Sequence, residues 1–412
     1  MLKNPLDSQL MQSSLTSSKR GANIVASPIR NLIPFADKAK KEGKKIIHLN
    51  IGQPDIKTPR VALSTVCNLK DEVIEYGPSA GDFALRVEVA KYYKKFGADL
   101  EMEDVFVCTG ASEAILFALM ATCDEGDELV IPEPFYANYL GFAQLAHVQV
   151  RAISCDIKKS FELPPVDEFE KLINPRTKAI LLCNPGNPTG QLYSKEELTS
   201  ILILAKKHRL YVIVDEVYKE FCYDDAFNSI LNYQGMEDHV IVIDSISKVF
   251  SACGARVGYL ITKNNSIRAA VNKIAQLRLC PPFYGQQLAL AAYSNADIYI
   301  ERAREEYKKR REVMYSRISQ IKDVFSYKPK AAFYNIVELP VEDAEVFCKW
   351  LLTDYEQDRH TLMLAPANGF YFNRELGKRQ VRIAYVLEEK LLHQAMDILE
   401  RALAQYQFSK RE

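Results

Sequence analysis

The sequence predicts an α/β protein with a large domain, built on a mostly parallel sheet flanked by helices, and a smaller α+β domain. Three observations lead to this prediction. Short apolar runs alternate with helical patterns between residues 105 and 262, strand and helix patterns follow in shorter blocks, and 412 residues exceed the usual size of one domain. Near-continuous apolar runs separated by helices are typical of strands buried on both faces, and hence of parallel sheet.

The expected strands of the large domain are seven apolar runs rich in β-branched residues. They cover residues 105–108, 128–131, 148–153, 179–183, 211–214, 240–244 and 257–261. Helical patterns are expected over residues 112–122, 195–208 and 266–276.

The smaller domain is predicted from both ends of the chain. A long amphipathic helix is expected over residues 298–321, because apolar side chains recur at helical spacing among Glu, Arg and Lys. The expected elements after it are an apolar run at 333–339, a helix at 344–353, a strand at 381–386 and a helix at 388–406; a helix at 31–43 should pack on the same domain. We therefore divide the chain into an N-terminal arm (1–28), the first part of the small domain (29–51), the large domain (52–296) and the C-terminal small domain (297–412).

The composition excludes several classes of function. Lys and Arg number 53 and Asp and Glu also number 53, so no basic field is available for nucleic acid or an anionic membrane. No apolar run is long enough to span a membrane, and the N-terminal arm lacks the apolar stretch of a signal peptide. The nine cysteines show no metal-binding spacing. We expect reduced thiols, no metal site and a cytoplasmic location.

Two segments that follow expected strands are suited to binding a ligand. Gly110 precedes a helix, so the first amides of that helix and the Ser112 hydroxyl favour an anion. A plain helix cap is the alternative interpretation of this segment. The segment 184–190, which reads Asn-Pro-Gly-Asn-Pro-Thr-Gly, is neither helix nor strand, and it should hold its amides at the carboxyl end of the sheet, where either Asn–Pro bond can be cis.

Two further strand ends carry charged residues. Asp215 closes an apolar strand, where a carboxylate is costly unless a cation faces it, and Tyr218 follows three residues later. Lys248 follows another strand and is a candidate nucleophilic amine, while Arg256 offers a planar fork for a phosphate. Taken singly, a solvated aspartate and a surface lysine loop are the alternatives.

These four segments meet where the strands of a parallel sheet end, which is where such sheets bind ligands. Together they describe a ligand with a phosphate, an aromatic nitrogen that takes a proton, a phenolate-type oxygen and an aldehyde for the lysine. The sequence therefore predicts pyridoxal 5′-phosphate as the cofactor.

From about residue 28 to residue 406 the chain resembles the fold-type I, class I/II pyridoxal-phosphate aminotransferases, in particular bacterial aspartate and aromatic aminotransferases. The motifs that carry the resemblance are Gly52-Gln53-Pro54-Asp55, Tyr76-Gly77-Pro78-Ser79-Ala80-Gly81, residues 109–113, 184–190 and 215–218, Ser245-Ile246-Ser247-Lys248 with Gly254-x-Arg256, and Val381-Arg382-Ile383. The resemblance implies an aspartate aminotransferase-like fold.

The resemblance also implies a role for each matching residue. Lys248 would form a Schiff base with the cofactor and then move a proton, and Asp215 would keep the ring nitrogen protonated. The 3-oxygen of the ring would accept hydrogen bonds from Asn187 and Tyr218. The ring itself would stack on Tyr136, with Phe135 as the alternative. The phosphate would be held by Ala111, Ser112, Ser245 and Arg256, and Ser247 would either bind phosphate or orient the lysine.

Substrate and partner roles follow from the same resemblance. Arg382 would bind the substrate carboxylate with the help of Gly52 and Asn187. Tyr76 would reach the phosphate of a neighbouring subunit, which implies a homodimer with shared active sites.

The expected reaction is transamination from an amino acid, aspartate or aromatic, to a 2-oxo acid such as 2-oxoglutarate. Arg278 does not match the spacing of the arginine that reads acidic side chains in the best-known branch, and Arg30 is another candidate for that task. The alternatives are a carbon–sulfur β-lyase on the same scaffold and a regulator that senses the cofactor.

Overall fold

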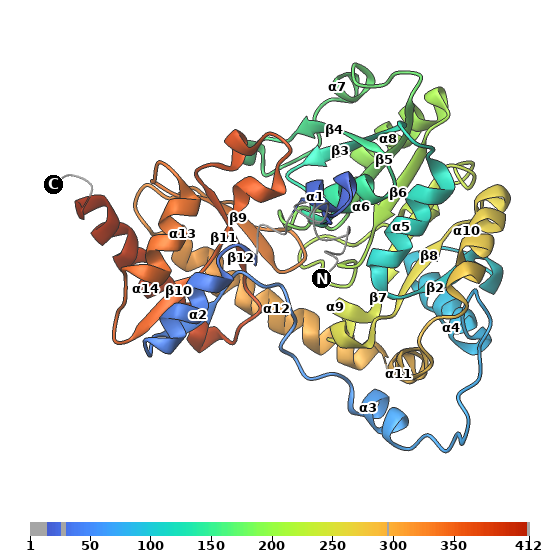
Figure 1. Cartoon of the computed structure of the whole chain (residues 1–412), viewed down its shortest axis with the longest axis horizontal. Helices are drawn as coiled ribbons and strands as arrows, with labels where there is room; N and C mark the ends of the chain where they lie inside the picture. The colour runs from blue at the N-terminus through green and yellow to red at the C-terminus, as the bar shows by residue number, and fades with distance from the viewer. Residues whose placement is uncertain (1–14, 26–29, 295, 410–412) are drawn as a thin grey trace, which may run out of the picture.

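The computed structural model describes residues 15–25, 30–294 and 296–409. Figure 1 shows a large domain and a small domain, with the long helix α12 (Ala296–Ile318) running from one to the other. Buried residues recur along α12 at helical spacing, among them Ile300, Ala303 and Tyr307, which is the pattern of the predicted amphipathic helix. The helix ends three residues earlier than predicted.

The sheet of the large domain has seven strands in the order β2-β8-β7-β6-β5-β3-β4. Their bounds are β2 (Val105–Cys108), β3 (Glu128–Glu133), β4 (Gln149–Ser154), β5 (Thr177–Cys183), β6 (Tyr211–Asp215), β7 (Val240–Ser245) and β8 (Gly258–Ile261). The five strands β3 to β7 are parallel, whereas β8 is antiparallel to both of its neighbours. The prediction of a mostly parallel sheet is confirmed, and each of the seven predicted runs forms a strand.

Helices cover both faces of this sheet because alternate strand residues point to opposite sides. Val212 and Val214 of β6 belong to the core under α4 (Phe83–Tyr93), α8 (Lys195–His208) and α11 (Phe283–Tyr293). Ile213 faces the other core, under α5 (Gly110–Thr122), α6 (Asn138–Leu145) and α10 (Asn265–Arg278). The remaining helices of this domain are α3 (Arg60–Cys67), α7 (Val166–Glu170) and α9 (Ile246–Val249).

The antiparallel strand β8 brings two loops of the site together. Cys108 at the end of β2 and Ser245 at the end of β7 both pair with Gly258, the first residue of β8. A side chain at Gly258 would place its Cβ 2.5 Å from the backbone nitrogen of Ala111, so only glycine allows this close approach. The start of α5 and the start of α9 therefore lie side by side.

The small domain contains a three-stranded antiparallel sheet, ordered β11 (Ala365–Pro366), β12 (Gln380–Ala384) and β9 (Tyr334–Glu338). A separate parallel pair joins β1 (Lys45–His48) to β10 (His360–Met363), which the sequence did not predict. The helices α2 (Ile33–Lys41), α13 (Ala344–Thr353) and α14 (Glu389–Ser409) complete the domain, and α2 packs on α13 and β1. Segments from both ends of the chain, among them β1 and α14, lie in this domain.

The segment after β6 belongs to the core of the small domain. Val217, Tyr218 and Phe221 cluster with Tyr307 of α12 and with Phe333. Asp215, at the end of β6, therefore lies where the large sheet gives way to the packing of the small domain.

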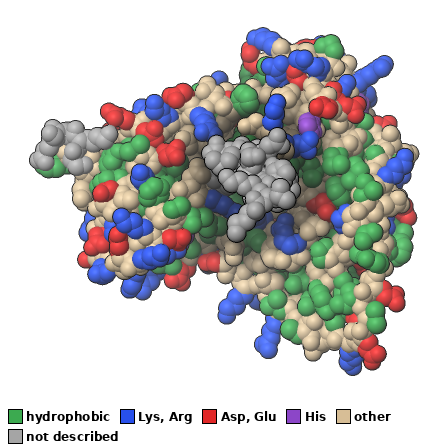
Figure 2. Space-filling model, viewed as in Figure 1, with side chains coloured by type: hydrophobic (Ala, Val, Ile, Leu, Met, Phe, Trp, Pro, Cys, Tyr) green, Lys and Arg blue, Asp and Glu red, His purple; other side chains and the backbone are tan. Residues whose placement is uncertain are grey.

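The surface carries mixed charges. Figure 2 shows Lys and Arg side chains intermingled with Asp and Glu over both domains, in keeping with the balanced charge count. Over the described ranges, no helix has the length and apolar character needed to cross a membrane, and no three His, Cys, Asp or Glu side chains converge as metal ligands. The short helix α1 (Lys19–Asn23) lies in the N-terminal arm; residues 1–14 and 26–29 of the arm fall outside the described residues.

Candidate active site

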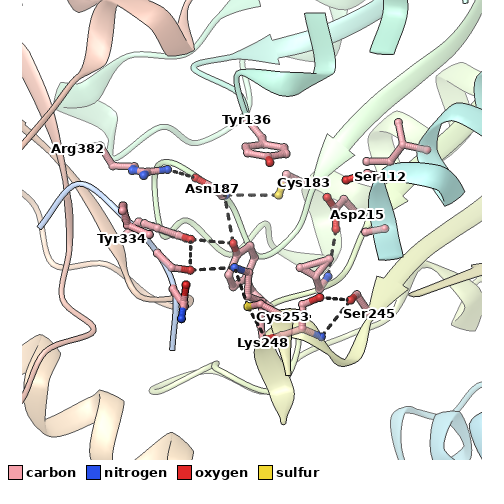
Figure 3. Close-up of a pocket in the computed structure, with 18 of the residues that line it drawn as sticks. Ser112, Tyr136, Cys183, Asn187, Asp215, Ser245, Lys248, Cys253, Tyr334 and Arg382 are labelled. Carbon is pink, nitrogen blue, oxygen red and sulfur yellow. Dashed lines mark hydrogen bonds between the residues drawn. The ribbon is translucent and has the colours of Figure 1, made fainter. Parts of the chain in front are cut away.

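A cavity of about 320 Å³ opens at the carboxyl edge of the large sheet, facing the small domain (Figure 3). Most of the residues that the sequence singled out line it. They are Gly52, Ala111, Ser112, Tyr136, Asn187, Asp215, Tyr218, Ser245, Ser247, Lys248, Arg256 and Arg382. Residues more than 300 positions apart in the chain therefore contribute to one site.

Lys248 projects into the cavity from the short helix α9. The hydroxyl of Ser245 accepts a hydrogen bond from the Ser247 amide at 3.0 Å, which caps this helix directly after β7. The Lys248 amine donates to the Gly52 carbonyl at 2.8 Å and lies 3.9 Å from the Cys253 sulfur. The lysine is thus held at the cavity wall by neutral partners, and no carboxylate of the described residues is hydrogen-bonded to its amine.

Asp215 is a buried carboxylate with neutral hydrogen-bond donors. The Tyr139 hydroxyl donates to Oδ2 at 2.7 Å, and the Val217 amide donates to Oδ1 at 3.2 Å. Burial raises the pKa of Asp215 to about 6, and the Tyr139 hydrogen bond opposes this rise. Such a carboxylate is suited to a cationic N–H donor inside the cavity.

Asn187 and Tyr218 both line the cavity and are hydrogen-bonded to each other; Figure 3 labels Asn187. Both Asn–Pro peptides of the segment 184–190 are cis, and this segment places Asn187 beside the end of β6. The Asn187 side-chain amide donates to the Tyr218 hydroxyl at 3.5 Å. Tyr218 is buried, which raises the pKa of its phenol and keeps it a hydrogen-bond donor at neutral pH.

Arg382 is a fully buried cation at the opposite wall. Its guanidinium donates to the Asn187 side-chain oxygen at 3.0 Å and to the Asn50 carbonyl at 2.6 Å. It also lies over the rings of Tyr334 and Phe370, at 4.6 and 4.8 Å. The Nε atom is buried and without a partner among the described residues. Burial lowers the pKa of Arg382, so an anion bound here would relieve an unfavourable charge.

The start of α5 and the Arg256 loop form an anion cradle. The first amides of a helix have no intrahelical partner, and here they belong to Ala111 and Ser112. Arg256 is exposed and donates to the Cys253 carbonyl at 3.0 Å and the Thr109 carbonyl at 3.4 Å. Gly110 has φ +75°, and a Cβ there would lie 2.3 Å from a guanidinium nitrogen of Arg256. The glycine therefore makes room for the arginine.

Of the two adjacent aromatic residues, Tyr136 lines the cavity, whereas Phe135 is buried in the core beneath it. Burial raises the pKa of Tyr136 to about 12. Tyr76 lies outside the cavity and is 81% exposed. Arg278 is also outside it, because its guanidinium donates to the carbonyls of Ser79 and Val107, each at 3.2 Å.

Several lining or supporting residues were not identified from the sequence. Tyr334 contacts Tyr218 and Gly52, Cys183 and Cys253 line the cavity, and Tyr139 binds Asp215. Tyr334 was included only as part of an apolar run. For Tyr139 one signal was available: a buried carboxylate needs a donor, and a tyrosine follows Tyr136 at nearly one helical turn.

The large domain brings Lys248, Asp215 and Arg256 to the cavity, and β12 of the small domain brings Arg382 to its opposite wall. These groups are suited to an enzyme whose ligands carry anionic groups and an amine. Comparison with known proteins gives the family. The model described as "Aminotransferase class I and II" matches residues 44–399, so the chain belongs to this family.

Known aminotransferases are similar to this chain in sequence and structure over nearly its whole length. An aspartate aminotransferase of Thermotoga maritima is 32% identical over 90% of this chain and 96% of its own. The structure of an alanine aminotransferase from Pyrococcus furiosus has a TM-score of 0.87 with 30% identity, covering 95% of this chain and all of that one. An aromatic aminotransferase from Pyrococcus horikoshii has a TM-score of 0.81 with 29% identity, over 90% and 99% of the two chains. The protein is an aminotransferase, as the sequence predicted, with an aspartate aminotransferase-like fold.

Proposed function

We propose that this aminotransferase uses pyridoxal 5′-phosphate to move the amino group of an α-amino acid to a 2-oxo acid. The observation that carries the proposal is the cavity in which the Lys248 amine, the buried Asp215 carboxyl and the Arg382 guanidinium face one space. Each of these groups lacks the partner that such a cofactor or substrate would supply. Within the described ranges, Asp215 is hydrogen-bonded only by neutral donors, and the Nε atom of Arg382 has no partner.

The residues present fit this cofactor. Arg256, Ser112 and the first amides of α5 would hold the phosphate, with the serine hydroxyls at the start of α9 beside them. Asp215 would pair with the ring nitrogen, Asn187 and Tyr218 with the ring oxygen, and Tyr136 would cover the ring. When bound, the cofactor supplies an aldehyde for an amine and a protonated ring that accepts the electrons of a carbanion.

Three residues of the chain then have separate roles in the proposed reaction. Asp215 holds a proton at the ring nitrogen, because an ionised carboxylate in this buried position needs a cation beside it. The Lys248 amine moves a proton to and from the substrate carbon, and the Gly52 carbonyl orients it. Arg382 has five N–H groups and uses two on Asn187 and Asn50, which leaves three for a substrate carboxylate.

For the substrate we favour aspartate or an aromatic amino acid, with an acceptor such as 2-oxoglutarate. The relatives named above act on aspartate, alanine and aromatic amino acids, so the side chain is the variable part. A second cavity of about 420 Å³ shares Ile51 and Tyr136 with the first. Arg30 and Lys40 line it together with the carboxylate of Asp37, the polar side chains of His48, Asn50 and Asn138, and apolar residues, so it offers groups for either an acidic or an aromatic side chain.

We further propose a homodimer with shared sites. Exposed apolar side chains gather on α3, α4 and α11, which pack together, and Figure 2 shows this part of the surface rich in hydrophobic atoms. Tyr76, in the segment between α3 and α4, is free to reach a neighbouring subunit.

A half-reaction panel tests the proposed reaction. The purified holoenzyme is mixed with single amino acids in the absence of an acceptor, and its visible absorption is recorded. A stoichiometric change in absorption with an amino acid, reversed by a 2-oxo acid, supports transamination. Release of pyruvate and ammonia without any acceptor would instead identify a β-lyase. Lys248→Ala should abolish turnover, whereas Lys263→Ala, which removes a lysine just after β8 and outside the cavity, should not.

A further inference from the structure

Tyr334 occupies the junction between the two walls of the cavity (Figure 3). It begins β9 of the small domain, and it pairs with Ala384, two residues beyond Arg382 on β12. Diagonal neighbours of this kind lie on the same face of an antiparallel sheet. The ring of Tyr334 consequently supports the Arg382 guanidinium, at 4.6 Å from its centroid.

The hydroxyl of Tyr334 points the other way, toward the large domain. It lies 2.9 Å from the Tyr218 hydroxyl and 3.3 Å from the Gly52 carbonyl. The Gly52 carbonyl also accepts from the Lys248 amine. One side chain of the small domain therefore contacts the carboxylate-binding arginine, the phenol that follows β6 and the loop that orients the lysine.

The proton of Tyr334 has two acceptors and can serve one at a time. If it bonds the Gly52 carbonyl, Tyr218 can donate to Tyr334, and its phenol is turned away from the cavity. If Tyr334 donates to the Tyr218 oxygen, Tyr218 is free to donate into the cavity, and it becomes a stronger donor because hydrogen bonds in a chain polarise one another. The two arrangements differ in how well Tyr218 neutralises a negative oxygen.

The contact between Tyr334 and Gly52 is sterically specified. A Cβ at position 52 would lie 1.8 Å from the Tyr334 hydroxyl, so any larger residue would expel that hydroxyl or displace the loop. The packing around Tyr334 is also closed, since Phe333 and Tyr218 contact its ring. The hydroxyl is thus held within reach of both acceptors.

We infer that Tyr334 is a positioning residue that couples carboxylate binding at Arg382 to hydrogen-bond donation by Tyr218. A carboxylate on Arg382 pulls on a guanidinium that rests on the Tyr334 ring, and the hydroxyl at the far end of that ring selects the acceptor. The inference rests on the proposed cofactor function, because it concerns the donor that would face the cofactor oxygen.

Two substitutions distinguish the role of the Tyr334 ring from the role of its hydroxyl. Tyr334→Phe keeps the ring under Arg382 and removes the hydroxyl, whereas Tyr334→Leu removes both. Tyr307→Phe is the matched control, because Tyr307 is a buried tyrosine of the same core, packed on Phe333 and outside the cavity.

The first readout is the pH at which the bound cofactor changes its visible absorption. In the resting enzyme the Gly52 carbonyl already accepts from Lys248 at 2.8 Å, so Tyr334 donates to Tyr218. Tyr334→Phe removes this polarising bond and makes Tyr218 a weaker donor. The cofactor oxygen would then keep more negative charge and hold the proton of the Lys248 nitrogen beside it more firmly. The midpoint should rise by about half a unit to one unit, while Tyr307→Phe leaves it unchanged.

The second readout is the dissociation constant of maleate, an unreactive dicarboxylate, from the holoenzyme. Tyr334→Phe should leave it within about twofold, and Tyr334→Leu should raise it by about tenfold, because the ring that supports Arg382 is lost. In the presence of saturating maleate, the pH midpoint of the wild type should shift, and that of Tyr334→Phe should shift less.

The coupling is refuted if maleate shifts the midpoint equally in the wild type and in Tyr334→Phe, or if Tyr334→Phe has the midpoint of the control. Failure of the proposed function would look different. The wild-type protein itself would then show no cofactor absorption, or no change in that absorption with any amino acid.

Discussion

Replacing Gly110 by alanine tests the anion cradle at the start of α5. The new Cβ would lie 2.3 Å from a guanidinium nitrogen of Arg256 and 2.8 Å from its central carbon. Arg256 is a flexible, exposed side chain, so it would move away at little cost in stability. The backbone angle adds a cost, because φ +75° is unfavourable for an L-residue by about 1–2 kcal/mol.

The functional cost should be larger than the cost in stability. A hydrogen bond to a charged group contributes about 1.5–3 kcal/mol, and the displaced Arg256 would lose such a bond to the phosphate. At about 1.4 kcal/mol for each factor of ten, the dissociation constant of pyridoxal phosphate should rise about 10-fold to 100-fold. Pyridoxal, which lacks the phosphate, should bind Gly110→Ala as it binds the wild type.

A second glycine separates the clash from the backbone strain. Gly126 has φ +86°, but a Cβ there meets no atom within 4 Å. Gly126→Ala should therefore show a similar loss of thermal stability with no loss of cofactor affinity. Both variants are measured by titrating the apoprotein with pyridoxal phosphate and with pyridoxal. The reasoning is refuted if Gly110→Ala binds pyridoxal phosphate as tightly as Gly126→Ala, or if it loses affinity for both compounds alike.

Three further predictions concern Asp215, Arg382 and Tyr76. Burial raises the pKa of Asp215 from 3.8 to about 6. Between pH 3.8 and pH 6 the folded apoprotein therefore keeps a proton on Asp215 that the unfolded chain has released. The stability of the folded apoprotein consequently falls as the pH rises through this range. The free energy of unfolding of the Asp215→Asn apoprotein should therefore exceed that of the wild-type apoprotein by up to about 3 kcal/mol at pH 8 and by almost nothing at pH 4. Melting curves at the two pH values measure this difference, and an equal effect at both would contradict the prediction. Arg382→Lys should raise KM for the amino acid by about 100-fold while the cofactor stays bound, because a lysine cannot form the two parallel hydrogen bonds that a guanidinium makes to a carboxylate. Loss of the cofactor would disprove the assignment of Arg382 to the substrate carboxylate. If Tyr76 serves the partner's site, mixing inactive Lys248→Ala subunits with Tyr76→Ala subunits should restore about a quarter of wild-type activity, and no recovery would exclude a shared site.

The order of strands and helices could be predicted because it depends on local patterns. The run at 211–214 is apolar at every position, and in the structure its alternate residues do face two separate cores. The antiparallel direction of β8 could not be predicted in this way, because a strand buried on both faces has the same pattern in either direction. The pairing of β1 with β10 joins segments more than 300 residues apart, for which the sequence holds no local signal.

The residues of the candidate site also fall into those that local sequence patterns predict and those that depend on contacts between distant segments. Lys248, Asp215 and Asn187 were identifiable because charged and amide side chains directly after buried strands are costly without a partner. Tyr334 was not, because a tyrosine in an apolar run is usually only a core residue. Its role depends on the register between β9 and β12 and on the contact between the domains. The carbonyls of Asn50 and Gly52 are backbone groups, which every residue possesses.

The sequence by itself determined the fold class, the family and the set of polar residues at the strand ends, because burial patterns and strand-end chemistry are local properties. The tertiary structure decided which of these residues share a cavity, that Tyr136 rather than Phe135 faces it, and that Arg278 does not. It also decided the partners of Arg382 and Lys248, since the loop at Asn50 and Gly52 meets a strand from the far end of the chain and a helix from its middle. Proximity between distant segments is a property of packing, and packing is fixed only when the whole chain has folded.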